Sequence, residues 1–443
     1  MLKIKLTERA DSEILVVGLG LVGKKLQIES TGAQIDTAAL LTTLHSMGAS
    51  GEVDEVIKLP SKSNKLIVFT GLGKIESNFS PELLRRAAGA ASRHLLGNDS
   101  ASFALPHKSV AEIAAIAEGA ALGSYAFTEF RGSSKGAQKN PLSSITVVTR
   151  FANTAQAKTA AKRAEIIAEQ TFLVRDLINT PPSSLTPDSF CLRAKKLASK
   201  YGVKVEILND AALRKGGYGG IIGVGQGSAN PPRLIHLTYS PAKAKKRFAF
   251  VGKGITFDTG GLALKPANGM EAMKADMSGA AAVVAAIFAI AQLKLPIAID
   301  AWAPLAENMV SDTATRPSDV ITIYGGKTVE VLNPDAEGRL VLADALVKAA
   351  EVGKKSGGLD GIIDVATLTG AQVVALGSRT SAVMTNDENF SGQFLTAANI
   401  AGESFWPMPL PVELRASLDS PIADLANIGD RMGGMLVAGL FLK

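Results

Sequence analysis

The sequence predicts an α/β protein with two domains: a smaller N-terminal α/β domain and a larger C-terminal domain whose mostly parallel sheet is covered by helices. The chain has 443 residues, which exceeds the usual size of one domain. Short apolar runs alternate with helical patterns along the chain, as in strand-loop-helix proteins. The runs of the second half are continuously apolar, which is typical of strands that are covered on both faces.

The first half contains the elements of a small α/β domain, which we place at residues 1–154. Strands are predicted at Glu13–Gly18, Lys65–Thr70 and Ser144–Thr149, and helices at Pro81–Leu96 and Val110–Tyr125. A long helical pattern, Ala155–Leu177, ends before Pro181 and Pro182, because two prolines cannot continue a helix. We therefore expect a connecting helix and proline-rich linker at 155–182 and a second domain at 183–443.

The second half repeats the alternation of strands and helices. Its strands are predicted at Lys204–Ile207, Arg233–Thr238, Arg247–Val251, Ala298–Trp302 and Gly361–Ala366. The helix predicted at Ser278–Gln292 is apolar around its whole circumference and should therefore be buried. In open α/β sheets ligands bind at the carboxyl ends of the strands, so we expect the functional residues there.

The composition excludes several classes of protein. Cys191 is the single cysteine, so neither an intramolecular disulfide nor a thiolate zinc cluster can form, and a reducing compartment is indicated. The four histidines are far apart, which excludes the H-E-x-x-H metalloproteases. The net charge of +6 is small for this length, and nucleic acid is not indicated as a partner. The longest apolar stretch, Met277–Ala291, is shorter than the roughly 20 residues of a membrane helix, so we expect a soluble, cytoplasmic protein.

A glycine motif near the N-terminus matches the pattern of dinucleotide-binding proteins. Gly18-Leu-Gly-Leu-Val-Gly23 matches the G-x-G-x-x-G fingerprint of dinucleotide-binding domains and directly follows a predicted strand. The fingerprint also requires an acidic residue about 20 positions later, whereas residues 38–45 form a helical pattern without a carboxylate. We therefore interpret the glycines as a turn that leaves a strand, and we rank a nicotinamide-dependent oxidoreductase last among the alternatives.

The charged residues that suggest chemistry lie in glycine-punctuated segments of the second half. They are Lys253, just after the strand that ends at Val251; Asp258, Lys265 and Asp276, in the loop that leads to the buried helix; and Asp335, Glu337 and Arg339. If the segment Asn333-Pro-Asp-Ala-Glu-Gly-Arg339 is extended, its three charged side chains point to one side. Asp276 and Ser278 are also suitable N-caps for the buried helix.

Four carboxylates in such apolar surroundings need positive partners, because buried carboxylates persist only when they are paired or bound to cations. Asp258, Asp276, Asp335 and Glu337 would converge with Lys253 in an oxygen-rich site with one amine ligand. Such a site suits two divalent metal ions that share carboxylates at a separation of about 3.5–4 Å. Lys253 can bind a metal only as the neutral amine, so the charge of the nearby metal must lower its pKa.

The second half resembles the leucyl aminopeptidase family, the dinuclear-metal cytosolic aminopeptidases. The resemblance runs from about Arg175 to the end and includes Asn179-Thr-Pro-Pro182, Gly223-Val-Gly-Gln-Gly-Ser228, Gly252-Lys-Gly-Ile-Thr-Phe-Asp258, Glu307-Asn-Met309, Asn333-Pro-Asp-Ala-Glu-Gly-Arg339 and Thr367-Leu-Thr-Gly370. The family signature is N-T-D-A-E-G-R, so Pro334 replaces its threonine. Family members continue past the equivalent of Lys443, and we expect this chain to lack the family's C-terminal end, either as a fragment or by natural truncation.

The resemblance implies a role for each matching residue. Lys253, Asp258, Asp276 and Glu337 would bind one metal ion, and Asp258, Asp335 and Glu337 the second, with Mn²⁺ or Zn²⁺ expected. Lys265 would stabilise the oxyanion of the tetrahedral intermediate, and Arg339 would hold a bicarbonate ion that acts as the general base. The substrate would contact Met273, Thr367, Leu368 and Gly370.

The same resemblance implies an activity and an assembly. The protein would be a leucyl aminopeptidase in which a metal-bridging hydroxide releases leucine or another apolar residue from peptides with a free N-terminus. A homohexamer is expected. The alternative is an inactive scaffold or binding protein, which the expected loss of the C-terminal end would favour.

Overall fold

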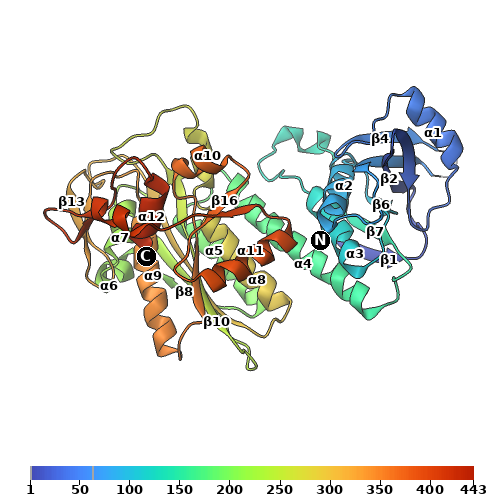
Figure 1. Cartoon of the computed structure of the whole chain (residues 1–443). Coiled ribbons are helices and arrows are strands. Elements are labelled where there is room, and N and C mark those ends of the chain that lie inside the picture. Colours follow the sequence, from blue (N-terminus) through green and yellow to red (C-terminus); the bar gives the residue numbers. More distant parts are fainter. Residues whose placement is uncertain (1, 62–63) are drawn as a thin grey trace. The chain divides into compact units, whose positions relative to one another are not determined.

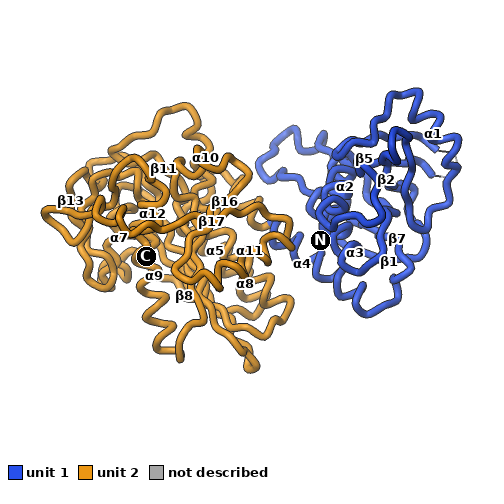
Figure 2. The backbone as a smooth tube through the Cα atoms, in the orientation of Figure 1, with its two compact units in different colours: residues 1–172 blue, residues 173–443 orange. Residues whose placement is uncertain are grey.

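The computed structural model describes residues 2–61 and 64–443. The chain forms two compact units that divide between Phe172 and Leu173 (Figure 2). The long helix α4 (Ala155–Asn179) crosses this division. Both units combine a sheet with covering helices, which confirms the predicted α/β class.

The sheet of the first unit has the strand order β1-β7-β6-β2-β5-β4, with β3 paired to β2. Its strands are β1 (Lys3–Thr7), β2 (Ile14–Val22), β3 (Lys25–Glu29), β4 (Val56–Pro60), β5 (Leu66–Lys74), β6 (Ser100–Phe103) and β7 (Ser144–Val148). The pairs β2–β3 and β4–β5 are antiparallel and the others are parallel. Helices α2 (Pro81–Arg93), α3 (Val110–Gly123) and α4 pack on one face and α1 (Thr37–Ser46) on the other.

The glycine motif of this unit lies in a strand and a hairpin. Gly18 and Gly20 are inside β2, and Gly23 has a φ of 62° where the chain turns into β3. A Cβ atom at Gly20 would lie 2.6 Å from the carbonyl oxygen of Gly73, so the glycine permits the close approach of two backbones. The predicted turn is therefore wrong for Gly18 and Gly20. The dinucleotide fingerprint needs a helix after the glycines, and here strand β3 follows them.

The second unit contains a larger mixed sheet with the order β15-β10-β12-β9-β8, and β11 also pairs with β12. Its strands are β8 (Lys204–Leu208), β9 (Arg233–Tyr239), β10 (Arg247–Gly252), β11 (Gly254–Asp258), β12 (Ala298–Asn308) and β15 (Gly361–Val365). Strands β10, β11, β12 and β15 are parallel, whereas β9 is antiparallel to both β8 and β12. All five strands predicted for this half are present.

Helices cover both faces of this sheet (Figure 1). Helices α5 (Pro187–Tyr201) and α8 (Ser278–Gln292) pack on one face, and α7 (Gly219–Gly225) and α9 (Gly338–Lys355) on the other. The remaining elements are α6 (Asp210–Gly216), η2 (Met270–Ala275), β13 (Asp319–Thr322), β14 (Thr328–Val331), α10 (Gly370–Leu376), β16 (Ser381–Val383), α11 (Glu388–Ala401), β17 (Phe405–Pro407), η3 (Val412–Leu418), β18 (Leu425–Ala426) and α12 (Gly434–Leu442).

The apolar helix α8 is a core helix, as its composition predicts. It packs on β10 and β12, and most of its side chains are buried. With η2 it forms Met270–Gln292, the one segment within residues 2–61 and 64–443 that is long and apolar enough to cross a membrane. Because 61% of its most apolar window is buried inside the protein, this segment is weak support for a membrane span.

The carboxyl ends of four parallel strands meet at one edge of the second sheet. Strand β10 ends at Gly252, β11 at Asp258, β12 at Asn308 and β15 at Val365. Helix α8 starts close to this edge, since Ala280 donates a backbone hydrogen bond of 2.8 Å to the carbonyl of Lys253. The edge thus brings together segments that are distant in sequence.

The start of α8 approaches the strands so closely that Gly279 has no room for a side chain. A Cβ atom there would lie 1.9 Å from the carbonyl oxygen of Val365. We expect Gly279→Ala to lower the free energy of unfolding by about 1–3 kcal/mol, measured by urea denaturation. Gly392→Ala is the control, because its Cβ atom would meet nothing within 4 Å on the exposed side of α11. An equal effect of both substitutions would contradict this interpretation.

Candidate metal centre

Lys253 occupies the centre of the edge where the four strands end. Its side chain is 3% exposed, and its Nζ atom lies 2.8 Å from Asp276 Oδ2 and 2.8 Å from Glu337 Oε1. The ammonium group also donates a hydrogen bond of 2.8 Å to the carbonyl oxygen of Thr367. Burial opposes a charge on Lys253, but the two carboxylates outweigh this effect and raise its pKa. In the metal-free protein Lys253 is therefore an ammonium ion.

Asp258 ends β11 and is held from several directions. Its Oδ1 atom accepts hydrogen bonds of 2.8 Å from the backbone amide of Gly260 and from Asn308 Nδ2. Its Oδ2 atom lies 2.9 Å from Lys265 Nζ, and this ammonium group also pairs with Asp335. Asp258 was expected in a loop; it lies instead in strand β11, because Gly254–Asp258 pairs with β12.

The segment that carries Asp335 and Glu337 is a turn followed by a helix start, so it does not have the extended conformation in which the three charged side chains would point to one side. The amide of Ala336 donates to the carbonyl of Asn333, and the amide of Asp335 donates to Asn333 Oδ1. Pro334 stands at the second position of this turn, where its fixed φ is favourable. Glu337 is the N-cap of α9, and Arg339 lies in the first turn of that helix.

Asp276 does not cap the buried helix. The N-cap position of α8 is Met277, and Ser278 Oγ donates to the carbonyl of Ala275 instead. The Oδ1 atom of Asp276 accepts a hydrogen bond of 2.7 Å from the hydroxyl of Thr367, and its Oδ2 atom faces Lys253. The carboxylate is therefore directed into the cluster.

The cluster has more negative than positive charge. Four carboxylates, those of Asp258, Asp276, Asp335 and Glu337, face the two ammonium groups of Lys253 and Lys265. Burial raises the pKa of Asp276 and Asp335, and it raises the pKa of Glu337 to about 8, although Lys253 opposes this shift. Ionising all four groups therefore requires further positive charge.

The residues present fit divalent metal ions. One oxygen atom from each of Asp258, Asp335 and Glu337 lies within 4.8 Å of the others. Asp276 Oδ2 and Glu337 Oε1 are buried, and among the described residues Lys253, at 2.8 Å from each, is their polar partner. Carboxylate oxygens with no other partner are suitable ligands for Mn²⁺, Mg²⁺ or Zn²⁺.

Arg339 is almost fully buried, and its charge interacts with that of Glu337. Its Nη1 atom donates a hydrogen bond of 2.7 Å to the carbonyl of Asn427, whereas its Nε atom has no partner within the described part of the chain. Burial lowers the pKa of Arg339 to about 10, against the opposing effect of Glu337. The guanidinium thus remains charged at neutral pH and retains a free donor, as an anion-binding group requires.

The four residues expected to contact the substrate come from two segments. Met273 lies in η2, in the turn that precedes Asp276. Thr367 and Leu368 follow β15, and Gly370 begins α10. Thr367 is also bonded to the cluster through its hydroxyl and its carbonyl, to Asp276 and Lys253 respectively.

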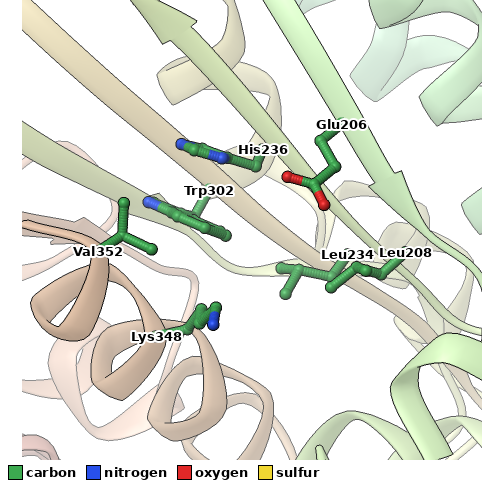
Figure 3. A pocket seen from close by; sticks show the side chains of 7 residues that line it. All are labelled: Glu206, Leu208, Leu234, His236, Trp302, Lys348 and Val352. Carbon is green, nitrogen blue, oxygen red and sulfur yellow. The ribbon is translucent and has the colours of Figure 1, made fainter. Parts of the chain in front are cut away.

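A separate cavity lies between the sheet and α9 (Figure 3). It has a volume of about 270 Å³ and is lined by Glu206, Leu208, Leu234, His236, Trp302, Lys348 and Val352. His236 stacks on Trp302 with 3.7 Å between ring centroids, and its Nε2 atom lies 2.9 Å from Asp300 Oδ1. None of the site residues predicted from the sequence lines this cavity.

Models of one protein family match nearly the whole chain. The catalytic domain of the cytosol aminopeptidase family matches residues 172–443, and the N-terminal domain of that family matches residues 16–134. The chain belongs to the cytosol aminopeptidase family.

Individual relatives agree with this membership. The chain is 49% identical to a protein named probable cytosol aminopeptidase from Streptomyces avermitilis, over 98% of this chain and 87% of the relative. It is 47% identical to a protein of the same name from Leifsonia xyli, over 98% of this chain and 85% of that relative. Among solved structures, the bottromycin maturation enzyme BotP in complex with Mn is similar, with a TM-score of 0.85 and 37% identity over 98% of this chain and 89% of that one.

Asn308 contributes to the cluster without having been assigned a role from the sequence. Its Nδ2 group donates to Asp258 and, at 3.1 Å, to the carbonyl of Pro334. It therefore connects two of the segments that carry carboxylates. Asn308 lies within Glu307-Asn-Met309, one of the blocks that carry the family resemblance. The resemblance indicates that the block is important but does not indicate which residues Asn308 contacts.

Removing the charge of Lys253 should make stability depend on pH. In metal-free Lys253→Met, buried Asp276 and Glu337 lose their positive partner, so their folded-state pKa values lie still further above the unfolded ones. Below the unfolded-state pKa both carboxyl groups are protonated in the folded and the unfolded protein, so the substitution costs little stability there. The free energy of unfolding then falls as the pH rises from the unfolded-state pKa towards the folded-state pKa. We expect a loss of about 3–5 kcal/mol near pH 8 and a smaller loss near pH 5.5, measured by urea unfolding in chelator.

The exposed lysine variant Lys243→Met provides the control for this experiment. It should unfold like the unsubstituted protein at both pH values. If Lys253→Met loses the same stability at pH 5.5 as at pH 8, the carboxylates do not depend on Lys253 in the way described.

Proposed function

We propose that the chain is a metal-dependent aminopeptidase that binds two divalent ions in the carboxylate cluster and releases N-terminal residues from peptides. The observation that carries the proposal is the convergence of four carboxylates and two lysines where the parallel strands end. Membership of the cytosol aminopeptidase family supports the class of reaction. The substrates are peptides with a free N-terminus.

The ligand sets are those that the family resemblance implies, and the clustering of Asp258, Asp335 and Glu337 supports them. Lys253, Asp258, Asp276 and Glu337 would hold the first ion, with Lys253 as the neutral amine. Asp258, Asp335 and Glu337 would hold the second, with Asp258 and Glu337 shared. Bound ions would supply Lewis acidity and would lower the pKa of a water molecule, so that a hydroxide shared by the two ions would serve as the proposed nucleophile at neutral pH. Manganese is the favoured metal, because the similar structure of BotP is a complex with Mn.

Lys265 and Arg339 are the proposed catalytic residues of the chain itself. Hydrogen bonding and charge from Asp335 and Asp258 outweigh burial and raise the pKa of Lys265 to about 12, so it carries a positive charge at neutral pH. That ammonium group would stabilise the oxyanion that develops on the substrate carbonyl. Arg339, with its unpartnered Nε, would hold a bicarbonate ion that accepts a proton from the nucleophile.

The N-terminal residue of the substrate would lie beside Asp276. Its free amine would bind one metal ion through the nitrogen lone pair and donate a hydrogen bond to the Asp276 carboxylate, whereas the lone pair of an acylated nitrogen is delocalised into its carbonyl and does not bind metal. Met273, Thr367, Leu368 and Gly370 would surround its side chain and backbone, and leucine or another apolar residue is the proposed preference. A cytoplasmic homohexamer completes the proposal and rests on the family resemblance.

Hydrolysis of leucine p-nitroanilide tests the proposed activity. We expect turnover with Mn²⁺ and its loss after treatment with chelator. Lys265→Ala should lower kcat by about 10²–10³-fold, because it removes the charge that stabilises the oxyanion. The exposed Lys243→Ala should retain full activity. Absence of turnover by the folded, manganese-loaded protein would contradict the proposal and favour an inactive binding protein.

Blocking the substrate amine tests the requirement for a free N-terminus. N-acetyl-leucine p-nitroanilide should show a kcat/KM at least about 10³-fold lower than leucine p-nitroanilide. The reason is that buried Asp276 would lose the substrate amine as its partner. Comparable rates for the two compounds would show that the protein is not an aminopeptidase.

A further inference from the structure

Asn427 is a fully buried residue that lies directly after β18, and its side chain bonds to one short segment of backbone. Its Oδ1 atom accepts hydrogen bonds from the amides of Leu332, at 2.9 Å, and Asn333, at 3.2 Å. Its Nδ2 group donates to the carbonyls of Asn333, at 2.7 Å, and Ala336, at 3.3 Å. All four bonds therefore go to residues 332–336, which join β14 to α9.

These bonds use the full capacity of the amide group. An asparagine side chain has two acceptor lone pairs and two donor hydrogens, and each is used here. The backbone of Asn427 takes part as well: its amide donates to the carbonyl of Glu330 at 2.9 Å, and its carbonyl accepts from Arg339 at 2.7 Å. One residue thus holds both the turn that carries Asp335 and the guanidinium of Arg339.

The proposed ligands differ in what supports them. Asp258 is held by Asn308 and the amide of Gly260, and Glu337 is paired with Lys253. Asp335 has the most exposed side chain of the four carboxylates, at 33%, and its side chain is paired with Lys265. The backbone position of Asp335 therefore depends on the turn at 333–336, which Asn427 holds at both ends and which Asn308 contacts at the carbonyl of Pro334.

We propose that Asn427 is a positioning residue that sets Asp335 for the second metal ion and Arg339 for the bound anion. The inference rests on the proposed function. Losing Asn427 weakens the second ion more than the first, because Asp335 would bind the second ion alone, whereas the first ion would use Lys253, Asp258, Asp276 and Glu337, of which Lys253, Asp258 and Asp276 have no contact with Asn427. Partners of metal ligands typically change metal affinity by about 10–100-fold, and we expect a loss of that size for the second ion alone.

The chain offers a matched control in the same pair of strands. The Oδ2 atom of Asp424 accepts hydrogen bonds from the amide of Thr328, at 2.8 Å, and from its hydroxyl, at 3.0 Å. These bonds also connect the β18 segment to β14, but they are exposed and reach no residue of 332–336. Asp424→Ala therefore loosens the same connection without releasing the turn that carries Asp335.

A manganese titration tests the inference. The metal-free chain of residues 1–443 is titrated with Mn²⁺, and free Mn²⁺ is measured by electron paramagnetic resonance. The unsubstituted chain should bind two ions per chain, and Asp424→Ala should bind each of them as tightly as the unsubstituted chain does. Asn427→Ser should bind the first ion unchanged and the second about 10–100-fold more weakly. Asn427→Asp keeps the volume and one acceptor oxygen but turns a carboxylate oxygen towards the carbonyls of Asn333 and Ala336, so its second ion should be weakened at least as much.

The outcomes separate this inference from the proposed function. If the unsubstituted chain binds two ions and hydrolyses leucine p-nitroanilide, while both Asn427 variants bind two ions equally well, the inference fails and the function stands. Equal weakening of both ions, or loss of folded protein in both variants, would assign Asn427 to the fold alone and overturn the inference. If the unsubstituted chain does not bind two Mn²⁺ ions, the proposed function fails and the inference fails with it.

Discussion

The buried ion pairs of Lys253 are the constraint on which the rest of the site depends. An ammonium group that is 3% exposed lies 2.8 Å from two carboxylates that are themselves buried. Neither side of this arrangement is stable without the other, because an unpaired buried charge costs several kcal/mol. The fold meets the requirement by ending four parallel strands at one edge and by starting α8 and α9 there.

This constraint also explains how a site without histidine or cysteine ligands can hold metals. In the metal-free state two ammonium groups partly neutralise four carboxylates. Divalent ions would supply the remaining charge, and their field would favour the neutral amine of Lys253. In the proposed function Lys253 is thus a counter-ion in the metal-free state and would be a ligand in the metal-bound state, a change that arginine could not make because it stays protonated.

Much of this was predictable from the sequence for physical reasons. Buried charged residues persist only when they are paired or bound to cations, so Lys253 after an apolar strand, and Asp258 and Asp276 in the glycine-punctuated segment before the buried helix, could be found without coordinates. The turn at Asn333 was mispredicted because proline is compatible with both an extended segment and a turn, and only the hydrogen bonds to Asn333 decide between them. Asn308 and Asn427 are uncharged and distant in sequence from the residues they hold, so no local pattern indicates their roles.

Diffraction from crystals grown with Mn²⁺ tests the central claim most directly. Anomalous difference maps recorded at the manganese absorption edge should contain two peaks in the cluster, with Lys253 Nζ bonded to one and Asp335 bonded to the other. The ion pairs of Lys253 with Asp276 and Glu337 should then be replaced by bonds to metal. A cluster without anomalous peaks, in which Lys253 keeps both ion pairs at saturating Mn²⁺, would contradict the account.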